Sequence, residues 1–176
     1  MSSSSRVVLA LRACTLREWR AADAESLVRH ANDPLVACNL RDRFPHPYTE
    51  ADAERWLSRT LAAHPVTDLA IEVEGAAVGA IGLMPQGDVF RRTAEIGYWL
   101  GRAYWGRGLA TDALRAATEW AFDCFDLCRL EAGVFDSNPA SRRVLEKAGY
   151  SCESVRRKAV TKDGRTMDEH VYVVLR

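Results

Sequence analysis

A pair of glycines at the start of an expected helix is the feature of this sequence with the clearest chemical meaning. Residues 98–111 read Tyr-Trp-Leu-Gly-Arg-Ala-Tyr-Trp-Gly-Arg-Gly-Leu-Ala-Thr, an apolar strand end followed by a short connection and an amphipathic helix. The first amides of a helix lack intrahelical partners and lie at the positive end of its dipole, so they can bind an anion. Gly106 and Gly108 would let the backbone approach a diphosphate without a Cβ in the way. The segment predicts a diphosphate site, and a strand-to-helix turn eased by glycine is the alternative.

Two other phosphate-binding loops do not fit this segment. The P-loop pattern GxxxxGK[ST] is excluded because no lysine follows Gly106 or Gly108 at the helix start. The dinucleotide fingerprint GxGxxG fails at its third glycine, where Thr111 stands. Three consecutive expected strands also precede the loop, whereas the dinucleotide-binding fold alternates strands and helices.

A second segment with polar residues at a helix start is residues 138–150, Asn-Pro-Ala-Ser-Arg-Arg-Val-Leu-Glu-Lys-Ala-Gly-Tyr. Asn138 suits an N-cap, Pro139 the first helical position and Gly149 the residue after the helix. Taken alone, Asn138 and Ser141 are interpreted as structural residues of that helix start.

Glu95 is the third feature, a carboxylate in the middle of an expected central strand. Alternation along the strand puts Glu95, Gly97 and Trp99 on one face. A charged side chain is rare at such a position unless it faces a wet cleft or has a partner. Two interpretations stay open: a general base that acts directly or through water, or an ion pair with Arg91 or Arg92.

Together the first two segments resemble the motifs of one family. Residues 105–110, Trp-Gly-Arg-Gly-Leu-Ala, resemble motif A of the GNAT acetyltransferases, (Q/R)xxGx(G/A), with Trp105 at the usual Gln or Arg position. Residues 138–150 resemble motif B of the branch that acetylates ribosomal-protein N-terminal alanines, with Tyr150 in place of phenylalanine. An aromatic residue at the Trp105 position is also found in that branch. The resemblance extends over residues 7–175.

The resemblance implies an enzyme that moves acetyl from acetyl-CoA to a primary amine by direct attack in a ternary complex. Ser141 would lie near the thioester as proton donor to the departing thiolate, and Asn138 would contact the pantetheine. Backbone amides of residues 97–100 would polarise the thioester oxygen. The implied contacts to acetyl-CoA are Trp99, Leu100, Trp105, Gly106, Arg107, Gly108, Leu109, Ala110, Thr111, Asn138 and Ser141. A GNAT-like domain that senses acyl-CoA without turnover is the alternative, which the presence of Glu95 and Ser141 disfavours.

The amine acceptor is expected between the loop of residues 41–48 and the last hairpin. Phe44, His46 and Tyr48 would line its site, unless these rings simply pack the loop against itself. An α-amine has a pKa of about 7.7–8.0 and lysine about 10.4, so a protein N-terminus needs only a modest base. Polyamines, aminoglycosides and small metabolites stay open as acceptors. Inward-pointing Arg41 or Arg43 would favour a succinyl donor over acetyl.

Hydrophobic periodicity predicts the elements that carry these residues. The fold class is α/β (α+β), the GNAT fold, with a mixed, mostly antiparallel central sheet of about seven strands, four flanking helices and the order βααβββαβαββ. Expected strands are residues 6–13, 69–73, 77–83, 90–100, 130–135, 150–159 and 166–175, and expected helices are residues 16–31, 49–61, 106–123 and 138–149. Thr49 and Asp52 predict a capping box at the second helix. Residues 35–48 are expected to form a fixed irregular loop, and residues 7–176 a single domain after a disordered leader, residues 1–6.

Composition narrows the class of protein. The 176 residues include 24 basic and 24 acidic side chains, and this zero net charge disfavours a nucleic-acid partner. The sequence has no apolar run near the roughly 20 residues of a membrane span, and its polar start is unlike a signal peptide, so a cytoplasmic protein without a membrane partner is expected. Five cysteines and four histidines match no metal-ligand spacing, so no metal is expected. The expected partners are an acyl-CoA and an amine, and a homodimer is allowed.

Overall fold

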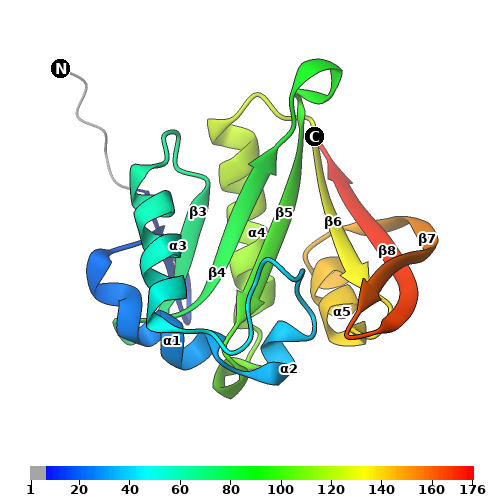
Figure 1. The fold of residues 1–176 in the computed structure, drawn as a ribbon. Helices are drawn as coiled ribbons and strands as arrows, with labels where there is room; N and C mark the ends of the chain where they lie inside the picture. The colour runs from blue at the N-terminus through cyan, green and yellow to red at the C-terminus, as the bar shows by residue number, and fades with distance from the viewer. Residues whose placement is uncertain (1–6) are drawn as a thin grey trace.

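One continuous sheet organises the computed structural model, which describes residues 7–176; the leader predicted for residues 1–6 lies outside this range. The strands follow the order β1-β2-β3-β4-β5-β6-β8-β7 (Figure 1). Within the described residues the β5–β6 pair is parallel and the other neighbours are antiparallel. The strands are β1 (Val8–Ala10), β2 (Thr15–Glu18), β3 (Asp68–Val73), β4 (Ala76–Pro85), β5 (Thr93–Leu100), β6 (Arg129–Phe135), β7 (Ser151–Lys162) and β8 (Arg165–Leu175).

Helices cover both faces of this sheet. The α-helices are α1 (Ala24–Ala31), α2 (Pro34–Ala37), α3 (Glu50–Ala62), α4 (Leu109–Cys124) and α5 (Pro139–Lys147). Figure 1 shows α1 and α3 in front of β3 and β4, with α4 behind the sheet. Two hydrophobic clusters match this division, one built around Leu114 of α4 and one around Leu57 of α3. No helix within residues 7–176 has the length and apolar character needed to cross a membrane.

The predicted fold class is confirmed, and the sequence found most elements at nearly their observed bounds. The predicted capping box is present: the Asp52 amide donates to the Thr49 hydroxyl at 3.3 Å, and the Thr49 amide donates to the Asp52 carboxylate at 2.8 Å. The predicted strand of residues 90–100 begins later, at Thr93, because residues 88–90 form a 3₁₀ turn. The segment expected to be wholly irregular contains the short helix α2, which Asp33 caps through the Leu35 amide.

The prediction of a helix over residues 16–31 is wrong for its first part. Residues 15–18 form β2, which pairs with β3 in the register Leu16↔Ile71, and α1 starts only at Ala24. The sheet therefore has eight strands, one more than expected. The sequence does not predict β2 because the charged side chain of Arg17 is buried there. A charge at a buried position interrupts the alternation of apolar and polar residues that identifies a strand.

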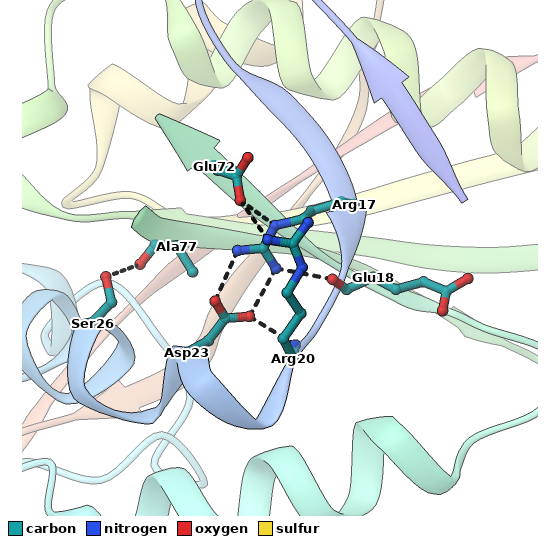
Figure 2. A network of polar contacts seen from close by, with 7 residues as sticks. All are labelled: Arg17, Glu18, Arg20, Asp23, Ser26, Glu72 and Ala77. Atoms are coloured by element: carbon teal, nitrogen blue, oxygen red, sulfur yellow. Dashed lines mark hydrogen bonds and ion pairs between the residues drawn. The ribbon is translucent and has the colours of Figure 1, made fainter. Parts of the chain in front are cut away.

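Arg17 is only 2% exposed because two carboxylates enclose its guanidinium (Figure 2). Asp23, before α1, accepts from Nη1 and Nη2 of Arg17 at 2.8 Å each, and Glu72 of β3 accepts from Nε. The Asp23 carboxylate also accepts from the Arg20 amide at 2.8 Å. A buried charge is tolerated only when it is paired and hydrogen-bonded, so this network fixes β2, β3 and the start of α1 to one another.

The sheet opens in its middle, and this opening positions the site. Strands β5 and β6 pair only over Thr93↔Arg129, Ala94↔Leu130 and Glu95↔Glu131. Beyond that point β5 continues to Leu100, while β6 continues to Phe135 paired with β8 on its other side. The facing edges of β5 and β6 are therefore unpaired along their second halves. We call this region the wedge.

Candidate active site

A cavity of about 1170 Å³ follows the wedge and reaches both faces of the sheet. One arm is lined by the start of α4 and the start of α5, the two places where the sequence predicts contacts to a cofactor. The other arm is lined by the loop of residues 41–48, by α3 and by the strands beneath them, where the sequence predicts the acceptor. We call these the donor arm and the acceptor arm.

The glycine loop of the donor arm has the conformation of an anion-binding cradle. Gly106 and Gly108 have φ angles of +73° and +80°, in the left-handed region that side chains rarely adopt. A Cβ built on either glycine would meet no protein atom within 4 Å, so the loop faces open space. Within residues 7–176, the amides of residues 106–110 donate no backbone hydrogen bond. Five unpaired N–H groups at the N-terminus of a 16-residue helix can hold a diphosphate.

The free edge of β5 offers two further amides to the cavity. The Gly101 amide donates to the Val78 carbonyl of β4 at 2.7 Å, so by alternation the Trp99 amide also points to β4. The Tyr98 and Leu100 amides therefore face the wedge. The Leu100 carbonyl accepts from Nε1 of Trp105 at 2.6 Å, which ties the loop to the strand. This bond gives Trp105 a structural role at the position where motif A usually has Gln or Arg.

The start of α5 places a hydroxyl at the middle of the wedge. Asn138 caps the helix as predicted, since its Oδ1 accepts from the Ser141 amide at 3.1 Å. The Ser141 hydroxyl lies 2.8 Å from the hydroxyl of Tyr98, which also donates to the Ser141 carbonyl at 3.3 Å. Burial raises the pKa of Tyr98 to about 12, against the opposing effect of its hydrogen bond to Ser141. Tyr98 is therefore a neutral donor at pH 7, and it was not among the site residues predicted from the sequence.

Glu95 lies where β5 and β6 part, and its side chain lines the cavity at 27% exposure. It also has a cationic partner: Oε1 lies 2.5 Å from Nη2 of Arg41. The predicted partners were wrong, because Arg92 pairs with Asp126 at 3.0 Å and the Arg91 guanidinium donates to a backbone carbonyl. Glu95 thus faces the cavity, as a general base must, and also forms an ion pair, with Arg41 rather than with Arg91 or Arg92.

The aromatic residues predicted for the acceptor site divide into two groups. Phe44 and Tyr48 line the cavity and pack with ring centroids 5.1 Å apart, and Phe44 also lies 5.5 Å from Trp99 of β5. Tyr48 is only 5% exposed, and burial raises its pKa to about 12. His46 is exposed and lies outside the cavity lining. The loop is thus packed by its own rings and lines the acceptor arm as well.

Three cavity residues of the acceptor arm were absent from the sequence prediction or left conditional in it. Arg41 and Arg43 both line the cavity. The Arg41 guanidinium donates to the Glu95 carboxylate, and that of Arg43 donates to Sδ of Met84 at 2.8 Å. Asp68, the first residue of β3, lies half-buried in the same arm. The strand expected from the sequence begins one residue later, at residue 69, and so does not include this carboxylate. Only strand pairing, which the sequence does not display, could have found it.

Comparison with known proteins gives consistent results. Residues 14–151 match the family described as Acetyltransferase (GNAT) domain. "Uncharacterized N-acetyltransferase p20" of Bacillus licheniformis is 27% identical over 173 residues, covering 92% of each chain. "Probable N-acetyltransferase YjcK" of Bacillus subtilis is 44% identical over 84 residues, which span 48% of this chain and 46% of that protein. The solved structure of Mycobacterium smegmatis RimJ in complex with CoA-disulfide is 26% identical with a TM-score of 0.79, covering 96% of this chain and 86% of that one.

Proposed function

The chain belongs to the acetyltransferase (GNAT) domain family, and we propose that it transfers the acetyl group of acetyl-CoA to a primary amine. Attack is direct, within a ternary complex of enzyme, acetyl-CoA and amine. The family resemblance seen in the two sequence motifs is thereby confirmed, whereas the choice of donor and acceptor is our proposal. The RimJ structure holds a CoA-disulfide, which supports a CoA ester as the donor for this chain.

The observation that carries the proposal is the wedge: Glu95 lies at the end where β5 and β6 part, the Ser141 hydroxyl lies beside Tyr98 further along β5, and the unpaired amides of the α4 start line the same cavity. The amides of residues 106–110 would bind the diphosphate, and the free edge of β5 would pair with the pantetheine arm. A thioester extended along this edge would end beside Ser141 and Glu95, where the acceptor arm opens. One cavity thus serves both substrates.

Acyl transfer needs a group that stabilises the oxyanion, a proton donor for the leaving sulfur and a base for the ammonium, and residues of this cavity can fill these roles. The amine nitrogen attacks the thioester carbon, a C–N bond forms, the C–S bond breaks, and an amide and a thiol result. The Tyr98 and Leu100 amides would stabilise the oxyanion, and the Ser141 hydroxyl would give a proton to the departing sulfur. An ammonium acceptor loses two protons overall. One goes to a base before attack, and the other balances the proton that the sulfur receives.

The base should be a carboxylate on the floor of the acceptor arm, and the sequence predicts Glu95. Its position at the end of the β5–β6 pairing suits this role. Its contact with Arg41 is a competing role, since Glu95 must release the guanidinium before it can receive an ammonium. The same contact holds the loop of residues 41–48 against β5. Because Glu95 engages Arg41, we propose acetyl as the donor's acyl group; Arg43 also lines the cavity, and its side chain contacts Sδ of Met84, so succinyl-CoA is the donor to compare with acetyl-CoA.

The experiment that tests the proposed function is release of CoA thiol from acetyl-CoA in the presence of a panel of amines and of peptides with free N-termini. We expect release that depends on the amine, with the acetylated amine found by mass spectrometry in equal amount. Tight acetyl-CoA binding without thiol release on any acceptor would instead support the non-catalytic acyl-CoA sensor. Failure to bind acetyl-CoA at all would contradict both functions.

A further inference from the structure

Three residues from neighbouring strands form one row across the floor of the acceptor arm. Asp68 of β3 is opposite Gly82 of β4, and Gly82 is opposite Gly97 of β5. Directly opposed residues of paired strands project from the same face, which here is the face of Glu95 and Trp99. A Cβ built on Gly82 would overlap Oδ1 of Asp68, whereas one built on Gly97 would meet nothing within 4 Å. The Asp68 carboxylate therefore leans across Gly82 toward open space above Gly97.

Asp68 differs from the other carboxylates of the cavity in having no cationic partner. Within residues 7–176 no lysine, arginine or histidine nitrogen lies within 4 Å of it, and the hydrogen bond that it receives is from the Thr67 hydroxyl at 3.1 Å. The remaining three cavity carboxylates each pair with an arginine: Asp52 with Arg55, Glu95 with Arg41 at 2.5 Å and Glu169 with Arg156 at 3.2 Å. Asp68 is thus the one left for a cationic ligand.

We propose that Asp68 receives the ammonium group of the acceptor and takes its proton before the nitrogen attacks. The inference rests on the proposed function and assigns the acceptor as an amine that arrives protonated. Neighbouring strands lie about 4.8 Å apart, so a nitrogen hydrogen-bonded to a carboxylate over Gly82 would lie above Gly97. That position adjoins the wedge, where the thioester would end. The N–H bond breaks, the proton passes to Asp68, and the freed electron pair attacks the thioester carbon.

The surroundings of Asp68 suit a carboxylate that gains and loses a proton. Burial raises its pKa, and the Thr67 hydroxyl and the charges of Arg59 on α3 and Arg43 on the acceptor loop act in the opposite sense. Glu95 of β5 shares this floor and pairs with Arg41, and Asp52 and Arg55 of α3 line the same cavity and pair with each other. A raised pKa makes Asp68 a better proton acceptor than an exposed carboxylate, and Arg59 and Arg43 help to keep it ionised until an ammonium binds.

The first test compares kcat/KM as a function of pH for wild type, Asp68→Asn and Glu54→Gln. Loss of a general base typically lowers the rate by roughly 10²–10⁴-fold, so we expect Asp68→Asn to lose about 10²-fold or more near pH 7. The loss should shrink as pH rises, because a growing share of the acceptor is already neutral. Glu54→Gln removes an exposed carboxylate of α3 outside the cavity and should match wild type. The Kd for acetyl-CoA should be the same in all three proteins, which also shows that the variants fold.

A second test does not require turnover. Ethylammonium is titrated into the CoA-saturated protein while the carbon-13 signal of the Asp68 carboxyl is followed, with ethanol as the uncharged control and Asp68→Asn to assign the signal. We expect ethylammonium alone to move it. Wild-type kcat/KM in Asp68→Asn near pH 7, or an Asp68 signal indifferent to ethylammonium, would overturn the inference. Absence of thiol release by wild type would instead count against the proposed function, while the titration still decides the role of Asp68.

Discussion

The hydroxyl of Tyr98 on β5 lies 2.8 Å from the hydroxyl of Ser141 on α5, so a hydrogen bond spans the wedge where β5 and β6 no longer pair. This bond holds the Ser141 hydroxyl, and the side chain of Asn138, the helix cap, accepts a hydrogen bond from the Ser141 amide. The proposed proton donor to sulfur is therefore held by two neighbours on different elements. We expect Tyr98 to act as a positioning residue, because its hydroxyl is hydrogen-bonded to the Ser141 hydroxyl, the proposed proton donor.

The first prediction concerns this pair. A single hydrogen bond contributes about 0.5–1.5 kcal/mol, so Tyr98→Phe should lower kcat by roughly 2- to 10-fold and leave the Kd for acetyl-CoA unchanged. Ser141→Ala should lower kcat further. In a Ser141→Ala background, Tyr98→Phe should have almost no additional effect on kcat. Steady-state kinetics of the two single variants and the double variant decide the matter, and fully additive losses would mean that Tyr98 acts independently of Ser141.

The second prediction uses two glycines that share a backbone conformation and differ in surroundings. Gly108 has φ +80° at the donor arm, and Gly75 has φ +83° in the β3–β4 turn, away from the cavity. A Cβ meets no neighbour at either site, so valine brings similar backbone strain to both. Gly108→Val should abolish acetyl-CoA binding in isothermal titration, whereas Gly75→Val should bind as wild type does. Equal affinity in both folded variants would place the diphosphate elsewhere.

The elements that the sequence predicted correctly depend on local spacing. The capping box of Thr49 and Asp52 and the cap at Asn138 involve residues three apart, so the sequence alone displays them. The sequence did not predict strand β2 because one of its two buried residues is Arg17, whose acceptor Glu72 is 55 residues away. A charged residue inside a strand looks like a break in the pattern until that distant partner is known.

The site shows the same division between local and long-range information. The glycine loop was predictable because a helix start and two glycines are contiguous in sequence. Asp68 and Tyr98 were not, since their importance comes from strand register and from a partner on another element. The ion pair of Glu95 was predicted with the wrong arginine for a related reason. Arg91 and Arg92 are near in sequence, but the acceptor loop brings Arg41 closer in space.

The third prediction concerns stability and follows from the raised pKa of Asp68. A carboxyl whose pKa is higher in the folded than in the unfolded state binds its proton more tightly when folded. Folding stability is therefore lost as pH rises from the unfolded value, about 3.9, through the folded pKa. Asp68→Asn avoids this loss and should be more stable than wild type near pH 7, with a smaller difference near pH 4. Thermal unfolding of both proteins near pH 4 and near pH 7 measures the difference in Tm between Asp68→Asn and wild type. An equal difference at the two pH values would mean that ionisation of Asp68 does not affect stability.

The last prediction separates the roles of Glu95 and Asp68. If Glu95 mainly holds Arg41, then Glu95→Gln and Arg41→Gln should have similar effects, because each breaks the same contact between β5 and the acceptor loop. Both side chains are partly exposed, at 27% and 48%, and such pairs contribute about 0–1 kcal/mol, so the expected rise in KM for the acceptor is at most roughly 5-fold. The double variant should be no worse than either single one, since the contact can be lost only once.

The pH dependence of kcat/KM is the measurement that distinguishes Glu95→Gln from Arg41→Gln. For both variants the profile should keep the shape of the wild-type profile, because the proton still passes to Asp68. A base, in contrast, would show a specific loss in Glu95→Gln that Arg41→Gln does not share. A drop of 10²-fold or more near pH 7 that recovers at high pH in Glu95→Gln alone would identify Glu95 as the base. Asp68 would then be left with binding of the ammonium, and Arg41 would have to move away from Glu95 in every catalytic cycle.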